Sequence, residues 1–257
     1  MILFLLKKTF FDVWDNLFTI FFVNVGCTLI IGAGLYLPSL LSFHPVPFYL
    51  GILLSLAAFS LYVGGAALLA RDVADYQAPG LKQFGRYLKE AWQAALALLV
   101  VIIAQLFILL VIIPWYFKMG HVVGLVIASL LFWVNVIGWL AMQYYFPVQS
   151  RLTRHFKKIA QKSLLLFFDN PGFSVFLGGG TLLLLVLSGV TAFLFPGLGV
   201  ILLWHQVGLK LRLYKYDYLE QHPEAQKQPI PWDALLAEDR DRVGSRTLRG
   251  MIFPWKE

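Results

Sequence analysis

Residues 16–70 read NLFTIFFVNVGCTLIIGAGLYLPSLLSFHPVPFYLGILLSLAAFSLYVGGAALLA and contain no Asp, Glu, Lys or Arg. A helix needs about 20 apolar residues to cross a bilayer, so this stretch is long enough for two crossings. Three further stretches, 91–117, 119–150 and 170–209, also lack these four residue types. Such long uncharged segments predict an all-α protein that crosses a membrane several times.

The composition of the 257-residue chain agrees with a membrane protein. Hydrophobic residues make up 59% and charged residues 14%, whereas a soluble domain carries about 25% charged residues. These values exclude a disordered chain, a collagen and a soluble nucleic-acid-binding protein. The net charge is +7, but the basic residues flank the apolar stretches, where anionic lipid attracts them. We therefore expect membrane lipid, and not nucleic acid, as a partner.

Prolines and short polar segments divide the four stretches into six expected membrane passes. These passes cover about 16–37, 48–70, 92–114, 122–146, 172–195 and 198–217. The sixth is the shortest, because only 13 residues separate Pro196 from Lys210, and it spans a bilayer only if Lys210 and Arg212 extend to the interface. The expected fold is a transmembrane helical bundle over 1–219, with interfacial amphipathic helices, and a short polar cytoplasmic tail over 220–257.

Basic residues occur in alternate connections between these passes. They gather in 71–90, in 149–171 and after residue 209, and Lys7 and Lys8 precede the first pass. The three intervening turns carry one charged residue between them. Because cytoplasmic loops are enriched in Lys and Arg, this alternation predicts six passes with both termini in the cytoplasm.

Two of the basic connections have the periodicity of amphipathic helices, which would lie in the membrane interface and lead into the next pass. They cover 81–92 and 151–166. The basic residues expected at the membrane surface are Lys82, Arg86, Lys89, Arg151, Arg154, Lys158 and Lys162. These helices either anchor the chain to lipid or form a docking surface for a partner protein.

A short pattern occurs twice in the chain. Residues 8–16 read KTFFDVWDN, and residues 162–170, which lie 154 positions later, read KSLLLFFDN. Together with the segment 81–92, these copies suggest three similar units, each an interfacial basic helix followed by a membrane hairpin. Asn170 directly precedes Pro171, so we expect the Asn170 side chain to cap the next helix.

Polar side chains within the expected passes are the natural candidates for a functional site. These intramembrane polar candidates are Asn24, Gln105, Asn135, Gln143, His205 and Gln206. None is a carboxylate, which a proton-coupled or cation-coupled transporter usually needs. Amides in membrane helices commonly bridge neighbouring helices, and the alternative is that they line a common cavity. The glycines at 178–180 predict close helix packing or a kink, because no strand precedes them as in a phosphate-binding loop.

The sequence shows no pattern of catalytic chemistry. Its five histidines are scattered, and no two of them have the spacing of a metal site. Phosphate-binding loops, nucleophile elbows and zinc-protease motifs are not found. A membrane enzyme acting on lipid would need a cluster of acids or histidines at an interface, and the sequence offers none. We therefore expect no catalytic residue, no metal and no cofactor.

The tail after residue 220 is polar and rich in proline, and its composition predicts a short helix over about 232–242. Its last residues are unusually apolar for a free segment. We expect this end to dock on the protein's own cytoplasmic face or on a partner. The residues expected to dock are Leu248, Ile252, Phe253 and Trp255.

Three segments resemble the YesL-like family of small bacterial integral membrane proteins, a family of unknown function. They are Phe10–Gly34, the segment LKQFGRYLKEAW at Leu81–Trp92, and Phe146–Gly199 with its Asp-Asn pair and the sequence FPGLG. The resemblance covers roughly residues 5–215 and does not include the tail. It implies a link to sugar-import ATP-binding-cassette systems, and it assigns no catalytic residue.

Two functions remain open from the sequence. The first is a non-enzymatic accessory, regulatory or assembly subunit linked to carbohydrate uptake, with transporter subunits or a second copy of the chain as its partner. The alternative is an oligomeric transporter or channel for a small solute. The alternative requires the polar candidates Asn24, Gln105, Asn135, Gln143 and His205 to face one cavity.

Overall fold

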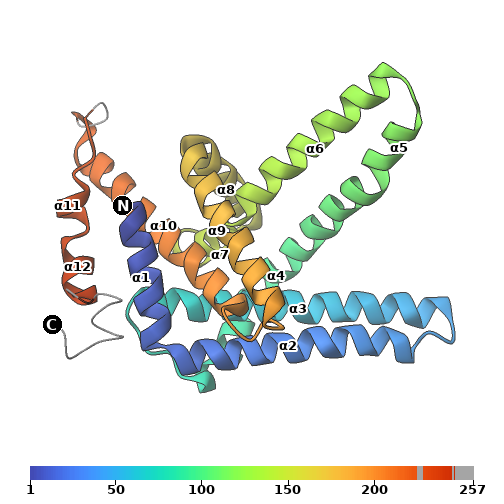
Figure 1. The fold of residues 1–257 in the computed structure, drawn as a ribbon, viewed down its shortest axis with the longest axis horizontal. Helices are drawn as coiled ribbons and strands as arrows, with labels where there is room; N and C mark the ends of the chain where they lie inside the picture. The colour runs from blue at the N-terminus through green and yellow to red at the C-terminus, as the bar shows by residue number, and fades with distance from the viewer. Residues whose placement is uncertain (225–227, 245, 247–257) are drawn as a thin grey trace.

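The computed structural model describes residues 1–224, 228–244 and 246, with only the backbone described at Leu81. Helices and the turns that join them make up this part of the chain, and no strand occurs in it (Figure 1). The helices are α1 (Ile2–Asp15), α2 (Leu17–Leu40), α3 (Pro45–Ala74), η1 (Leu81–Gln83), α4 (Phe84–Phe107), η2 (Ile108–Ile112), α5 (Ile113–Lys118), α6 (Val122–Met142), α7 (Tyr145–Arg151), α8 (Phe156–Asp169), α9 (Pro171–Val190), α10 (Gly197–Gln221), α11 (Trp232–Leu235) and α12 (Ala237–Val243).

Five helical segments of the described chain are long and apolar enough to cross a membrane. They are Leu17–Leu40, Pro45–Ala74, Phe84–Lys118, Val122–Arg151 and Pro171–Val190. The protein is therefore an all-α membrane bundle, which confirms the expected fold class. The sixth expected pass, 198–217, forms the helix α10. This helix is not among the five apolar segments, because its second half, from Lys210 onward, contains several charged side chains.

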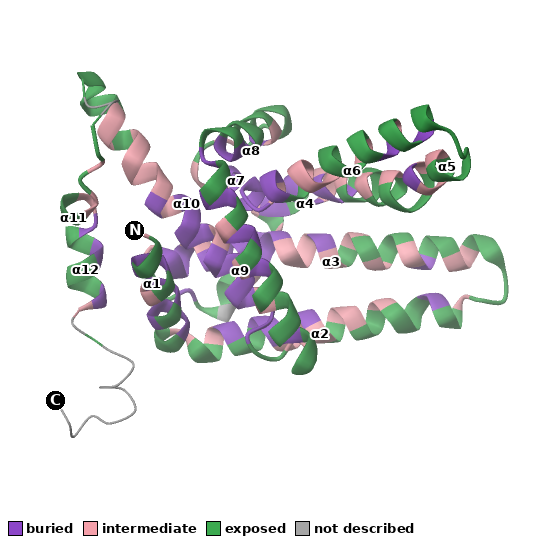
Figure 2. Cartoon of the chain, turned by 45° about the horizontal axis from the view of Figure 1, so that its top comes forward, coloured by how far each residue is buried: buried purple, intermediate pink, exposed green. Residues whose placement is uncertain are grey.

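Two long hairpins form arms that extend from a common core. The first arm is α2–α3, and the second runs from α4 through η2 and α5 into α6 (Figure 1). The two arms pack against each other at Gly64 of α3 and at Ala91 and Ala95 of α4. A Cβ on Gly64 would lie 3.0 Å from the Cβ atoms of both alanines, so these small residues let the two helices approach closely. Beyond this contact the arms separate and their side chains are largely exposed (Figure 2). The weakly charged turns after α2 and α5 lie at the far ends of these arms.

The second arm is longer than the sequence predicts. The third pass was expected to end near Pro114, but the helix continues to Lys118 through a π-helical turn, η2, at Ile108–Ile112. A proline removes one backbone donor and clashes with the carbonyl one turn earlier, and a π-turn relieves this clash without ending the helix. The expected interfacial helix over 81–92 is also wrong as a separate element, since α4 runs on from Phe84 into the span.

The third hairpin, α9–α10, ends beside the first turns of α2. Asn24 of α2 donates its Nδ2 to the carbonyl oxygens of Leu194 and Pro196 at 3.1 and 2.6 Å. In the middle of α10, the Lys210 ammonium donates to the Ala74 carbonyl oxygen at the end of α3. Gly199 also contacts Asn24, and the rise along the helix from Gly199 to Lys210 is about 17 Å. This is roughly half of a bilayer core of about 30 Å. The expected sixth pass therefore runs along only part of α2 and α3.

The repeated sequence pattern corresponds to a repeated structure in two of the three expected units. The helices α1 and α8 each contain 14 residues, each ends at the Asp of an Asp-Asn pair, and each leads directly into a long apolar helix. The helix α8 begins at Phe156, later than expected, because α7 ends at Arg151. Asn170 occupies the N-cap position of α9, but the expected side-chain cap is wrong. Its Nδ2 instead donates to the Tyr216 hydroxyl at 2.6 Å.

The described part of the tail packs on the protein itself. The helix expected over 232–242 is divided into α11 and α12, and Leu236 and Val243 are buried in the main hydrophobic core. The four residues expected to dock, Leu248, Ile252, Phe253 and Trp255, lie outside the described residues, so their docking stays a prediction.

The glycines of α9 give a first prediction, because neighbouring positions have opposite surroundings. A Cβ on Gly178 would lie 2.6 Å from a methyl carbon of Leu140 on α6, whereas a Cβ on Gly179 would meet no atom within 4 Å. Close packing is therefore confirmed at Gly178, and at Gly180, where a Cβ would lie 2.7 Å from the Trp204 ring, but not at Gly179. Gly178→Leu should lower the free energy of unfolding by about 1–3 kcal/mol, and Gly179→Leu should change it by less than about 0.5 kcal/mol. Thermal unfolding of both variants in mild detergent measures the difference, and equal losses would contradict the packing.

Candidate functional site

Four of the six intramembrane polar candidates line one cavity of about 570 Å³. Gln105 comes from α4, Asn135 from α6, Gln143 from the end of α6 and His205 from α10. Residues of α3 and α9 complete the wall. The cavity therefore lies where the second arm meets the third hairpin, and it joins side chains that are as many as 100 positions apart in the sequence.

Gln143 has an unpaired acceptor in this cavity wall. Its Nε2 donates to the Ser174 carbonyl oxygen at 2.8 Å. Its Oε1 is buried and has no hydrogen-bond partner among the described residues. A buried polar atom without a partner costs about 1–3 kcal/mol, and buried side-chain oxygens are normally paired. Gln143 therefore holds an unused acceptor just below the cavity surface, which a ligand hydroxyl or amide group reaching that depth would pair with.

His205, which also lines the cavity, is held in a defined orientation. Its Nε2 lies 2.8 Å from the Thr181 hydroxyl, and that hydroxyl donates to the Leu177 carbonyl oxygen at 3.0 Å. Because the Thr181 proton is used in the second bond, Nε2 of His205 is the donor in the first. The neutral imidazole then carries its free lone pair on Nδ1, so His205 contributes a second acceptor.

Of the other two polar residues of the cavity, Asn135 makes one hydrogen bond among the described residues and Gln105 is closely packed. The Asn135 Nδ2 donates only to the Leu131 carbonyl oxygen of its own helix, at 3.2 Å. The Gln105 Nε2 lies 2.4 Å from the point where a Cβ on Gly138 would sit, so this glycine leaves the space that Gln105 occupies. The remaining lining residues are mostly aliphatic or aromatic, and none carries a formal charge. A few placed polar groups in an apolar wall are typical of small-molecule sites.

The other two candidates bridge helices. Asn24 binds the turn between α9 and α10, and the Gln206 Nε2 donates to the Ala67 carbonyl oxygen of α3 at 3.0 Å. Neither residue lines the cavity. The expectation that Asn24 shares a pore with the other four residues is therefore wrong, because backbone groups of the third hairpin use all of its polar atoms.

A buried network of charges at the base of the arms was not predicted. Lys8 of α1 is completely buried and forms an ion pair with Asp12 at 2.9 Å. Its ammonium also lies 3.5 Å from the centre of the Tyr76 ring. Nearby, Lys210 of α10 lies 3.4 Å from Asp75 and 3.5 Å from Asp239 of α12. The spacing of four residues between Lys8 and Asp12 was the available signal in the sequence.

Burial changes the acid–base properties of this pair. It raises the pKa of the Asp12 carboxyl to about 6, although the charge of Lys8 and its hydrogen bond oppose this change. Burial also lowers the pKa of the Lys8 ammonium from its ordinary value, against the opposing charge of Asp12. The network joins α1, α3, α10 and α12, so it fixes the base of the arms and the described tail together.

The seven basic residues expected at the membrane surface differ in exposure and in ion pairing. Arg151 is an exception to the expectation, because its guanidinium makes two hydrogen bonds to the Asp75 carboxylate, at 3.0 and 3.1 Å, and it is largely buried. Arg154 is exposed and pairs with Glu90 at 2.7 Å. The other five are exposed and make no ion pair within the described chain; they are Lys82, Arg86, Lys89, Lys158 and Lys162.

Comparison with protein-family models, curated protein sequences and solved structures found no match. The resemblance to the YesL-like family therefore stays a prediction. The fold and the cavity define the class of the protein, an α-helical membrane protein with a neutral cavity between its helices. Within the described residues, no three His, Cys, Asp or Glu side chains gather in a way that would hold a metal ion.

Proposed function

We propose that this chain is a non-enzymatic protein of the bacterial inner membrane that binds an uncharged small molecule between its helices, as a transporter or channel for that solute does. Four polar side chains on one cavity carry the proposal, together with the Gln143 Oε1, which has no partner in the part of the chain that the structure describes. The wall contains acceptors and no formal charge, so the fitting ligand has a hydrogen-bond donor and an apolar body. Self-association would then complete a transport path.

A photoreactive monooctanoylglycerol, with an uncharged glycerol head and a diazirine in its chain, tests this proposal. In nanodiscs, we expect cross-links to cavity residues such as Trp139, and competition by monooctanoylglycerol but not by the octanoate anion. Gln143→Leu should lower the affinity about tenfold, because a ligand hydroxyl loses its acceptor. If octanoate competes as well as the neutral monooctanoylglycerol does, the proposal is wrong.

Gln149→Leu is the matched control for this experiment. Gln149 is also a buried glutamine whose Oε1 has no partner in the described chain, but it lies on α7 and does not line the cavity. The affinity of the control should equal that of the wild type. Equal losses in the two variants would show that a general change of packing, and not the cavity, controls binding.

A second function, an accessory subunit linked to carbohydrate uptake, is favoured by the exposed basic residues at the start of α4. With both termini in the cytoplasm, Lys82, Arg86 and Lys89 would face a partner such as a transporter subunit, or anionic lipid. Changing these three residues to Glu should abolish co-purification of a partner from native membranes, whereas Lys118→Glu at the far end of the second arm should not. Recovery of only the single chain, with normal sugar uptake in a deletion strain, would contradict this function.

A further inference from the structure

A second cavity, of about 880 Å³, lies between α1, α9 and α10 and is separate from the site described above. Leucine and aromatic side chains form most of its wall; examples are Leu183, Leu184 and Leu187 on α9 and Phe10 and Trp14 on α1. Its volume falls in the upper part of the range of small-molecule sites, about 300–1,000 Å³. We call it the α1 groove.

The α1 groove opens toward the hydrocarbon of the membrane. The helix α1 buries one face and exposes an apolar stripe formed by Leu3, Leu6, Phe10 and Trp14. It runs across the start of α2 and does not continue it (Figure 1). A helix with such a stripe lies in the interface with its apolar side toward the acyl chains. Leu183 on α9, in the opposite wall, is 61% exposed, so acyl chains have direct access to the groove.

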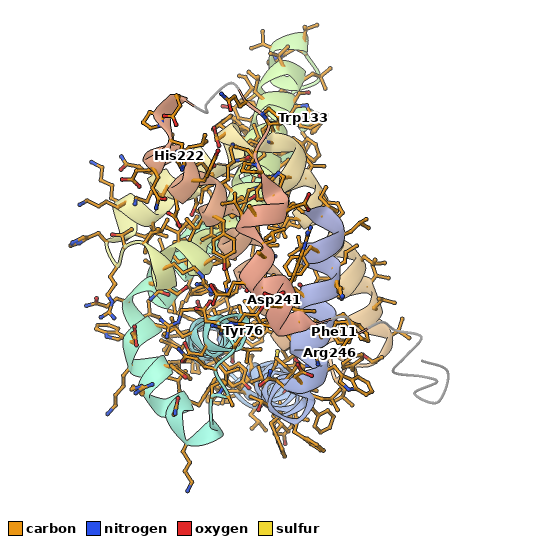
Figure 3. The ribbon with its side chains drawn as sticks, turned by 90° about the vertical axis from the view of Figure 1, so that its left-hand side faces the viewer. Phe11, Tyr76, Trp133, His222, Asp241 and Arg246 are labelled. Carbon is orange, nitrogen blue, oxygen red and sulfur yellow. The ribbon has the colours of Figure 1, made fainter. Side chains whose placement is uncertain are left out.

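Positive charge lies at one part of the groove wall. Phe11 and Arg246 lie next to each other at the side of α1 (Figure 3). The charge of Arg246 is balanced by Asp15, which its guanidinium contacts at 2.8 Å. Lys7 donates to the Gly244 carbonyl oxygen at 3.0 Å, and no carboxylate of the described chain pairs with it. Within the described chain, one positive charge at the groove is therefore not balanced by a carboxylate.

Thr9 adds an unpaired hydroxyl to the same wall. It is 6% exposed and lines the groove, yet its Oγ1 has no partner among the described residues. A threonine in a helix usually donates to the carbonyl oxygen one turn earlier, as Thr28 and Thr181 do here. Thr9 thus holds an unused hydroxyl donor just below the groove surface, which a phosphate or ester oxygen reaching that depth would pair with.

We infer that the α1 groove binds one anionic phospholipid. An acyl chain fills the space between α1 and α9, the phosphate lies at Lys7, and a phosphate or ester oxygen accepts a hydrogen bond from Thr9. The protein's own end is a poorer occupant, since the segment 247–257 contains Arg249 and Lys256 against the single acid Glu257 and would bring more positive charge to Lys7.

Native mass spectrometry of the full chain tests the inference. The protein is released from nanodiscs with equal amounts of phosphatidylglycerol and phosphatidylcholine, and the retained lipid is identified. We expect one phosphatidylglycerol per chain in the wild type, and a loss of about tenfold in its retention for both Thr9→Val and Lys7→Gln. Leu183→Trp, at an exposed position where the new ring fills the groove, should remove the lipid without disturbing the core.

Ser163→Ala and Lys118→Gln are the matched controls. Ser163 occupies the position of Thr9 in the repeated pattern, and its hydroxyl is also buried and unpaired in the described chain, but it does not line the groove. Both controls should retain the lipid as the wild type does. Equal retention of phosphatidylcholine, equal losses in Ser163→Ala, or a several-fold gain on removal of 247–257 would each overturn the inference, the last by showing that the tail is the occupant.

Discussion

Replacing Lys8 with Met is expected to lower the free energy of unfolding by about 3–5 kcal/mol, the range observed when one partner of a buried ion pair is removed. The Lys8 ammonium is fully buried, and Asp12, its partner at 2.9 Å, is 5% exposed. Without Lys8, the buried Asp12 carboxyl must either stay charged away from water or take up a proton on folding, and both cost free energy; the Tyr76 ring, which faces Lys8 in the wild type, offers no opposite charge. Chemical unfolding in mixed detergent micelles, followed by tryptophan fluorescence, measures the loss.

The double variant Lys8→Met with Asp12→Leu separates charge from packing. Replacing both members of a buried pair with apolar residues of similar volume is often neutral or stabilising, so the double variant should recover most of the loss. If it is as unstable as Lys8→Met alone, the loss comes from altered packing of α1 and the electrostatic explanation is wrong.

The loss in Lys8→Met should also depend on pH in a defined direction. Burial already raises the pKa of Asp12 to about 6 in the folded wild type, above its ordinary value of 3.8. Removing the opposing charge of Lys8 raises it further. A group whose folded pKa is raised favours folding most at low pH, where it binds a proton, and this contribution is lost as the pH rises. The deficit should therefore be larger at pH 8 than at pH 5, and the opposite order would contradict the assignment.

The long helices could be predicted from the sequence because the bilayer leaves the backbone few choices. An uncharged stretch such as 16–70 must satisfy its backbone hydrogen bonds internally, and helices do so. The ends of the helices were less predictable, because a proline does not always stop a membrane helix. Pro38 lies inside the last turn of α2, and Pro114 follows a π-turn within the second arm.

The candidate site could be predicted in its residue types but not in its grouping. Intramembrane amides and a histidine are rare enough to be selected from the sequence, and four of them do share a cavity. Asn24 has the same chemistry and a different role, because its position on α2 faces the turn of the third hairpin. Helical periodicity predicts which face of a helix carries an amide, but it does not predict which helix packs against that face. The grouping of the amides in the cavity depends on this packing.

Lys8 shows why the charged network could not be recognised. Basic residues beside an apolar stretch are typical of a membrane surface, and Lys82 and Lys89 fit that rule because they are exposed. Lys8 breaks the rule since Asp12, one helical turn later, and Asp239 of α12 lie close to it in the folded chain. Only the packing of α1 on α10 makes this position an interior one, and that packing depends on residues about 200 positions away.

The second large effect is expected for Asn24→Leu. Asn24 is fully buried, its Nδ2 donates to two carbonyl oxygens of the turn between α9 and α10, and its Oδ1 accepts from the Gly199 N–H at 2.8 Å. Leucine has a similar size but would leave these three backbone groups unpaired. Each unpaired group costs about 1–3 kcal/mol in a protein interior, and membrane interiors give lower values, so we expect a loss of about 2–4 kcal/mol.

The geometry of this turn explains why one side chain has so large an effect. Ala192 and Phe193 adopt positive φ angles of 50° and 63°, a region that side chains disfavour. Gly197, also at positive φ, has no space for a Cβ, which would lie 2.3 Å from the Asn24 Cγ. The turn is therefore strained and closely fitted to Asn24, so it needs this anchor to keep its shape.

Asn135→Leu is the control, because the Asn135 amide bonds only within its own helix. It should cost less than about 1 kcal/mol, and hydrogen exchange of 191–199 should rise in Asn24→Leu alone. The two variants also separate stability from binding. Asn135 lines the cavity, so its loss should weaken ligand binding directly, whereas Asn24→Leu should weaken binding only by loosening α10, which carries His205. If both variants lose the same stability and the same affinity, the turn is not the anchor that positions α10 at the cavity.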